Sequence, residues 1–251
     1  MKSGVQSNQS MDISELPVLI LAGGLGTRLR SAFDSGPKSM APVGGRPFLE
    51  YLLLQVRDAG FRNILLCVGY GREQIESWAG DGARWGLGIR YSSEPEPRGT
   101  AGAVKLAEGL IDSEVFLVMN GDSYLAADLR RMVEFHLRSD AWATIALVEV
   151  RDASRYGTVV LSAEGKIAAF LEKRVGAGGS GSQNLINGGV YVFRNSVLSV
   201  VPELKAVSLE REILPQLLTK KVNGFISEGY FIDIGLPHDF MRAQIELPEH
   251  I

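Results

Sequence analysis

The sequence predicts an α/β fold with a mixed, mostly parallel central sheet flanked by helices. Two features indicate this fold: buried strands alternate with helices through the first half of the chain, and the second half is richer in strands. Alternation of this kind implies parallel strands covered by helices. A chain of 251 residues, 45% of them hydrophobic, can form such a core as a single domain without disulfides or a structural metal.

The predicted strands are short apolar runs, many of them bounded by glycine or polar residues. They are expected at 17–22, 63–68, 89–92, 115–119, 143–150, 157–161, 166–171, 188–193 and within 224–234. Helices are expected at 47–59, 73–79, 100–110, 129–139 and 208–218.

The ends of the domain follow from composition. Residues 1–14 are polar and Ser-rich and are expected to be a disordered leader. No signal peptide is expected, because this stretch has neither the charged nor the apolar region that one needs. Residues 15–251 then form the folded domain. The Gly- and Ser-rich run 176–182 is too short for a domain linker and is expected to be a loop.

Charge and cysteine content limit the class of protein. The net charge of −3 argues against a general nucleic-acid or membrane-surface binder, and no apolar stretch approaches the length of a membrane span. Cys67 is the single cysteine, so no disulfide framework can form within the chain. We therefore expect a cytoplasmic protein, with Cys67 as a buried strand residue rather than a nucleophile.

A Gly-rich turn directly after the first predicted strand is the strongest local signal. It reads Leu21-Ala-Gly-Gly-Leu-Gly-Thr-Arg-Leu29, and its glycines let backbone N–H groups approach an anion. Arg28 and, ten residues later, Lys38 could add positive charge over the same phosphate. The alternative is a plain turn with surface charges. The turn is not a dinucleotide fingerprint, because Leu29 replaces its third glycine, and a Walker A loop needs a Gly-Lys-Ser/Thr that the chain lacks.

Two aspartates beside glycine form the second signal. Asp122 follows the strand 115–119, and Asp233 lies near the end of the last predicted strand. Strand ends at the carboxyl edge of an open α/β sheet are where ligands bind. Two carboxylates there suit Mg²⁺, which prefers oxygen ligands and also takes substrate phosphate oxygens. The alternative is that each aspartate simply forms a turn.

Glu94 opens a Pro- and Gly-rich segment that leads into the helix predicted at 100–110. A carboxylate accepts two hydrogen bonds, and the N1–H and N2–H₂ edge of guanine donates two, so Glu94 matches guanine better than uracil or thymine. The alternative is a solvated turn residue or one bonded to a backbone N–H. Further on, Glu172 and Asn187 could bond sugar hydroxyls and Lys173 a sugar phosphate, although such residues are often only exposed. The three histidines show no spacing typical of zinc ligands.

Taken in order, these motifs resemble those of the sugar-1-phosphate nucleotidyltransferases, and within them most closely the D-glycero-α-D-manno-heptose 1-phosphate guanylyltransferases. The resemblance covers residues 18–244 and rests on LAGGLGTRL, PKSMAPVGGRPFLEY, EPRGTAGA, NGDS, RYGTV, FLEK, INGGVY and FIDIG. It implies a Rossmann-like single domain of the nucleotide-diphospho-sugar transferase type. It also implies an enzyme that transfers a nucleoside monophosphate from an NTP, here GTP, to a heptose 1-phosphate in nucleotide-sugar biosynthesis for capsule or surface polysaccharide.

The resemblance also assigns roles to residues. Nucleotide binding falls to Leu21, Ala22, Gly23, Gly24, Gly26, Thr27, Arg28, Glu94, Gly99, Thr100 and Gly121. Sugar phosphate binding falls to Gly157, Glu172, Lys173 and Asn187, and Asp122 and Asp233 would hold Mg²⁺. The catalytic residues would be Arg28, Lys38, Asp122, Lys173 and Asp233, acting through positioning and charge neutralisation during direct in-line attack.

Two positions depart from the family pattern, and the substrates stay open. Ser39 stands where proline is usual, and Arg98 replaces the usual leucine. The partners expected are small molecules and neither nucleic acid nor membrane, and small enzymes of this type often form homodimers. The alternatives are the same chemistry on mannose, glucose or amino-sugar 1-phosphate with UTP or another NTP, or a non-catalytic regulator that binds sugar nucleotides.

Overall fold

A computed structural model describes residues 12–24, 26, 29, 33, 36–171, 184–203 and 205–250. Its strands are β1 (Val18–Leu21), β2 (Pro42–Val43), β3 (Arg46–Pro47), β4 (Asn63–Val68), β5 (Gly88–Ser93), β6 (Val115–Asn120), β7 (Ser123–Leu125), β8 (Ala143–Glu149), β9 (Thr158–Leu161), β10 (Ile167–Leu171), β11 (Leu185–Arg194), β12 (Val222–Ser227) and β13 (Phe231–Asp233). Its α-helices are α1 (Phe48–Asp58), α2 (Arg72–Ala79), α3 (Gly99–Leu106), α4 (Leu129–Leu137), α5 (Leu214–Leu217) and α6 (Pro237–Glu246).

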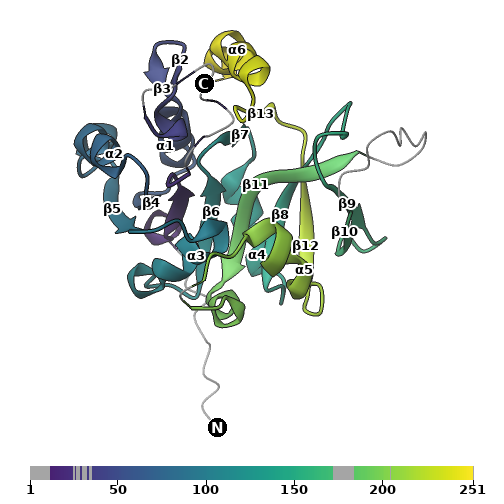
Figure 1. Ribbon diagram of the computed structural model, residues 1–251. Helices are drawn as coiled ribbons and strands as arrows, with labels where there is room; N and C mark the ends of the chain where they lie inside the picture. The colour runs from purple at the N-terminus through teal and green to yellow at the C-terminus, as the bar shows by residue number, and fades with distance from the viewer. Residues whose placement is uncertain are drawn as a thin grey trace.

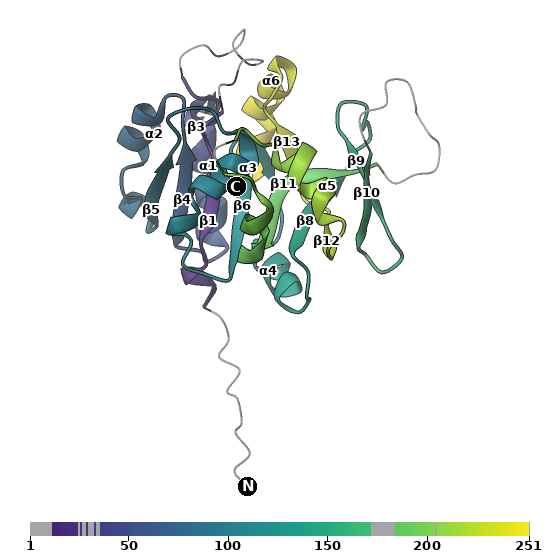
Figure 2. The ribbon, with the colours of Figure 1, turned by 60° about the horizontal axis from the view of Figure 1, so that its bottom comes forward.

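The central sheet is mixed, as predicted. Its main order is β10-β9-β11-β6-β1-β4-β5, with β8 beside β11 and β12 beside β8. The strands β6, β1, β4 and β5 run parallel, as do β8 and β12, whereas β11 is antiparallel to both β6 and β8. Figures 1 and 2 show β5 and the β9–β10 hairpin at opposite ends of this sheet. The parallel half follows the strand and helix alternation of the sequence.

Two hydrophobic cores lie on the two faces of the sheet. Along β1, Val18 and Ile20 face one core with α1, α4 and α6, whereas Leu19 faces the other core with α3 and α5. Strand side chains alternate between faces, so a strand buried on both sides is apolar throughout. This explains the continuous apolar runs in the sequence.

Several elements differ from the sequence prediction. The region 224–234 is split between β12 in the main sheet and β13, which pairs with β7 in a separate two-stranded sheet. The helix expected at 208–218 begins with a π-helical turn, Leu209–Ile213, before α5. Helix α6 was not predicted, although Pro237 occupies a favourable first-turn position in it. Within the described residues, no helix has the length and apolar character needed to span a bilayer.

Candidate active site

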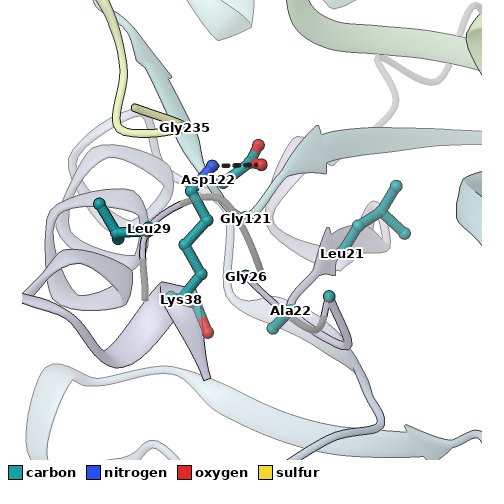
Figure 3. A pocket seen from close by; sticks show the side chains of 10 residues that line it. Leu21, Ala22, Gly26, Leu29, Lys38, Gly121, Asp122 and Gly235 are labelled. Carbon is teal, nitrogen blue, oxygen red and sulfur yellow. Dashed lines mark hydrogen bonds and ion pairs between the residues drawn. The ribbon is translucent and has the colours of Figure 1, made fainter. Parts of the chain in front are cut away.

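A cleft opens at the carboxyl edge of the sheet between β1 and β6. Strand β1 pairs with β4 on one side and β6 on the other, so the order of strands changes direction there, which is where α/β sheets bind ligands. The N–H of Gly121 donates to the carbonyl of Leu21 (3.1 Å) and joins the two strand ends. The cleft has a volume of about 210 Å³ and is lined by Leu21, Ala22, Gly24, Gly26, Leu29, Lys38, Ser39, Gly121, Asp122 and Gly235 (Figure 3).

Two glycines of the turn after β1 are required by the local geometry. Gly26 has a φ of +58°, and a Cβ there would lie 3.0 Å from the Cβ of Lys38. A Cβ at Gly23 would lie 2.5 Å from Oε1 of Glu94. A side chain at either position would push away a residue predicted to contact nucleotide, so the glycines allow the turn, Lys38 and Glu94 to pack closely.

Lys38 lies between the two predicted metal ligands. Its Nζ is 2.8 Å from Oδ2 of Asp122, a contact drawn as a dashed line in Figure 3. The same Nζ is 3.6 Å from Oδ1 of Asp233, and the Lys38 side chain is 9% exposed. Asp122 lies in the two-residue turn between β6 and β7, and Asp233 ends β13. The N–H of Ile234 donates to the carbonyl of Asp122 (3.0 Å). The pairing of β13 with β7 therefore brings together two aspartates that are 111 positions apart.

The two carboxylates fit a divalent cation. Mg²⁺ takes oxygen ligands and commonly keeps waters and substrate phosphate oxygens beside one or two carboxylates. The ammonium of Lys38 shows that the space between Asp122 and Asp233 accommodates positive charge. No cluster of three or more His, Cys, Asp or Glu residues suited to a metal occurs in the described part of the chain.

Glu94 bonds the backbone of its own segment. Its Oε2 accepts from the N–H of Arg98 (3.0 Å), which was the alternative raised from the sequence. Each carboxylate oxygen has two lone pairs, so this bond leaves acceptor capacity for a base. Burial raises the pKa of Glu94 above its ordinary value, and the bond from Arg98 opposes that rise. The backbone of Arg98 thus orients Glu94, while nothing in the structure explains the choice of the Arg98 side chain.

A second, larger cleft adjoins the first. Its volume is about 600 Å³, and Asp122 and Gly235 line both clefts. Gly157 and Asn187, both predicted to bind the sugar phosphate, line the second cleft together with Asp233. Asn187 is oriented by its neighbours, since its Nδ2 donates to the hydroxyl of Tyr191 (2.9 Å) and its Oδ1 accepts from the N–H of Gly189 (2.9 Å).

One side of the second cleft carries a cation fixed by a buried carboxylate. Arg155 precedes β9, and its guanidinium donates to both oxygens of Asp239 at 2.7 and 3.3 Å. Asp239 lies in the first turn of α6, and its side chain is 5% exposed. Both residues line the cleft. The ion pair therefore joins α6 to the loop before β9 and places a guanidinium in the cleft that Asp122 and Asp233 also line.

Gly99 packs against the segment before the π-helical turn, and Thr100 is hydrogen-bonded to the turn itself. The hydroxyl of Thr100 donates to Oε2 of Glu210 (2.8 Å) and accepts from the N–H of Leu209 (2.7 Å). A Cβ at Gly99, whose φ is +69°, would lie 2.5 Å from the carbonyl oxygen of Val207. Neither Gly99 nor Thr100 lines the two clefts described above.

Known proteins of similar sequence and structure share this architecture. The family model described as "Nucleotidyl transferase" matches residues 17–250. The chain belongs to the nucleotidyl transferase family.

Individual relatives are similar along nearly the whole chain. It is 40% identical to a D-glycero-alpha-D-manno-heptose 1-phosphate guanylyltransferase of Aneurinibacillus thermoaerophilus, over 94% of this chain and 100% of that one. It is 36% identical to a mannose-1-phosphate guanylyltransferase of Mycobacterium tuberculosis, over 94% of this chain and 66% of the relative. The crystal structure of HddC from Yersinia pseudotuberculosis complexed with GMP-PN superposes with a TM-score of 0.79 at 33% identity, covering 92% of this chain and 99% of that chain.

The structure of this nucleotidyltransferase brings most of the predicted site residues to one edge of the sheet. Seven of them share the first cleft: Leu21, Ala22, Gly24, Gly26, Lys38, Gly121 and Asp122. Gly23 and Glu94 lie against each other at the strand ends next to it. The predicted residues Thr27, Arg28, Glu172 and Lys173 lie outside the described residues.

Sequence reasoning missed other residues of the two clefts. Ser39 lines the first cleft, is 3% exposed, and its hydroxyl has no hydrogen-bond partner among the described residues. Arg155, Glu210 and Asp239 line the second cleft. Arg155 stands in the quoted motif RYGTV, which was a signal available in the sequence. Glu210 looked like an ordinary position on a predicted helix, and only the tertiary structure turns it toward the cleft.

Proposed function

We propose that this enzyme transfers GMP from GTP to D-glycero-α-D-manno-heptose 1-phosphate, giving a GDP-heptose and pyrophosphate. The observation that carries the proposal is the junction of two clefts at Asp122, with Lys38 between Asp122 and Asp233. A transferase of this kind must bring two anionic substrates together at one point. Two clefts that meet at Asp122, with the ammonium of Lys38 beside it, are suited to this. The similarity to the D-glycero-alpha-D-manno-heptose 1-phosphate guanylyltransferase of Aneurinibacillus thermoaerophilus supports the choice of heptose and GTP.

The first cleft is suited to the triphosphate. The backbone after β1 comes close to Lys38 because of Gly26, so N–H groups and one ammonium can face the same phosphates. Arg28 is expected to add a guanidinium, as the sequence implies. Glu94 at the end of β5 would accept hydrogen bonds from the N1–H and N2–H₂ groups of guanine.

The second cleft is suited to the sugar phosphate. Asn187 offers an oriented amide to sugar hydroxyls, and Gly157 lines the same cleft. Arg155 supplies a fixed guanidinium on the same wall, and Lys173 and Glu172 are expected to complete the site. These groups would hold the sugar phosphate with one of its oxygens directed at the first cleft.

In the reaction, an oxygen of the sugar phosphate attacks the α-phosphorus of GTP in line with the leaving pyrophosphate. A bond forms between that oxygen and the α-phosphorus, and the bond from the α-phosphorus to the β-phosphate bridging oxygen breaks. The attacking oxygen is already ionised, so no general base is required. Lys38 stabilises the negative charge at the reacting centre. Asp122 and Asp233 would hold Mg²⁺, which supplies neutralisation of phosphate charge when bound.

A second candidate substrate is mannose 1-phosphate. The chain is 36% identical to a mannose-1-phosphate guanylyltransferase, and the chemistry at the junction would be unchanged. The two sugars would be distinguished in the second cleft, where the sugar lies.

The test is release of pyrophosphate by the purified protein with Mg²⁺ across four NTPs and a panel of sugar 1-phosphates. We expect the highest kcat/KM with GTP and heptose 1-phosphate. Preference for mannose 1-phosphate would move the assignment to the second candidate. Turnover with UTP but not GTP would refute the role of Glu94, and no turnover with any pair would refute the proposed function.

A further inference from the structure

The carboxylate of Glu210 accepts three hydrogen bonds in the wall of the second cleft. Oε2 accepts from the hydroxyls of Thr100 (2.8 Å) and Ser208 (3.1 Å), and Oε1 accepts from the hydroxyl of Tyr191 (3.3 Å). Glu210 belongs to the π-helical turn Leu209–Ile213, and turns of this kind occur frequently at functional sites. Two of its three donors, Thr100 and Tyr191, come from helix α3 and from strand β11, which belong to different parts of the fold.

On the β11 side, the network fixes the orientation of Asn187. A carboxylate only accepts hydrogen bonds, so the hydroxyl of Tyr191 must donate to Glu210 and accept from Asn187. Burial raises the pKa of Tyr191 well above its ordinary value, so the hydroxyl keeps its proton. The side of the Asn187 amide that faces Tyr191 is therefore its NH₂ group. Its second N–H and one lone pair of Oδ1 then have fixed directions at the cleft that Asn187 lines.

On the α3 side, the same carboxylate fixes the start of the helix. The hydroxyl of Thr100 donates to Glu210 and accepts from the N–H of Leu209 (2.7 Å), and the N–H of Ala101 donates to the carbonyl of Val207 (3.0 Å). Arg98, the residue directly before α3, donates its backbone N–H to Glu94. The position of the α3 N-terminus, and with it that of Glu94, thus depends on the 207–210 segment.

We propose that Glu210 is a positioning residue that aligns the binding surfaces of the two substrates. Through Tyr191 it orients Asn187 toward the sugar, and through Thr100 it sets the segment that carries Glu94 toward the base. The inference rests on the proposed function for the identity of the two ligands. It goes beyond that function because it assigns one carboxylate to both subsites, with a separate side chain leading to each.

The experiment uses three test variants of the full chain and one rescue variant, with steady-state kinetics for each substrate. Tyr191→Phe removes only the branch to Asn187 and should raise the KM for the sugar 1-phosphate about tenfold, with the KM for GTP changed less than about twofold. Thr100→Val removes only the branch to α3. It should raise the KM for GTP about tenfold, with the KM for the sugar 1-phosphate changed less than about twofold. Thr100→Ser should restore the wild-type KM for GTP. Glu210→Gln should raise both KM values, because an amide cannot accept from donors on both sides.

The control is Tyr91→Phe, which also removes a hydroxyl bonded to a neighbouring group, here the carbonyl of Gly80 (2.5 Å). Tyr91 lines neither cleft, so its variant should keep both KM values. Lower melting temperatures with unchanged KM values in the three test variants would show a purely structural network and overturn the proposal. Equal changes of both KM values in Tyr191→Phe and Thr100→Val would also overturn it.

Binding without turnover separates this inference from the proposed function. Titration calorimetry with GTP alone should show weaker binding to Thr100→Val and Glu210→Gln and unchanged binding to Tyr191→Phe. This pattern in a protein that releases no pyrophosphate would defeat the proposed function while supporting the α3 branch of the network. Equal GTP affinity in all three variants would refute that branch.

Discussion

Replacing Lys38 by methionine should strengthen divalent metal binding to the nucleotide-free protein while reducing turnover. The ammonium lies 2.8 Å from Asp122 and 3.6 Å from Asp233, so it occupies the space that a metal would share. A unit charge and a divalent ion about 4 Å apart repel by about 2 kcal/mol even at the dielectric constant of water, which corresponds to about a 30-fold change in affinity. Methionine has a similar length and removes this repulsion.

The loss of turnover has a different cause. The ammonium of Lys38 would no longer stabilise charge on the reacting phosphates, and removing one such group typically costs about 10²–10³ in kcat. The ion pair itself should contribute little to folding, because the Asp122 side chain is 44% exposed and exposed pairs are worth about 0–1 kcal/mol. We therefore expect Lys38→Met to fold with a melting temperature close to that of the wild type.

The assay is titration of nucleotide-free protein with Mn²⁺ and Mg²⁺ by calorimetry, followed by pyrophosphate release with saturating substrates. Lys105→Met is the matched control, since Lys105 is also largely buried (16% exposed) and ion-paired at 2.7 Å to Glu108, but lines neither cleft. This control should leave metal affinity and turnover unchanged. Unchanged or weaker metal binding by Lys38→Met would refute the placement of the metal between the aspartates.

Three further predictions follow from the same structure. Asp122→Ala and Asp233→Ala should each lower kcat about a hundredfold or more without loss of fold, measured by pyrophosphate release and circular dichroism; near-normal activity in Mg²⁺ would contradict the metal assignment. The KM for GTP should rise as the pH falls, beginning at a higher pH than an ordinary glutamate would cause, because burial raises the pKa of Glu94. Glu94→Gln should raise this KM and abolish its pH dependence, and a persisting dependence would exclude Glu94 as its source. Stability should fall from pH 8 to pH 5 by about 2 kcal/mol from His136 alone, because burial lowers its pKa to about 4 and the unfolded chain, with a pKa near 6.5, binds more protons. Urea unfolding of wild type and His136→Leu checks this, and equal pH dependence of the two proteins would contradict it.

The turn after β1 shows what local sequence could determine. Glycines that follow an apolar strand predict a turn whose backbone other groups can approach closely, and this prediction needs no knowledge of the tertiary fold. In the structure, Gly26 has a positive φ and lies beside Lys38. It was likewise predictable that the strands ending near Leu21 and Asn120 share one edge of the sheet, because the carboxyl ends of parallel strands from alternating elements meet at the same edge. Residues in this cleft were therefore mostly found from the sequence.

The second cleft was less accessible to such reasoning. Arg155 and Asp239 are 84 positions apart, and their ion pair depends on α6, a helix that was not predicted. Glu210 lies within a helix that the sequence predicts over 208–218, whereas in the structure it belongs to a π-helical turn and accepts hydrogen bonds from Thr100 and Tyr191. These contacts carry no periodic signal along the chain.

The sequence by itself determined the alternating α/β architecture, the glycine-rich turn after β1 and the placement of two aspartates at or just after strands, since each depends on residue types within a few positions. The tertiary structure decided how these parts meet. The pairing of β7 with β13 brings Asp122 and Asp233 to Lys38, and the fold joins the two clefts at that point. The distances between Lys38 and the two aspartates are set by the packing of whole helices and strands against one another, which local residue preferences do not encode.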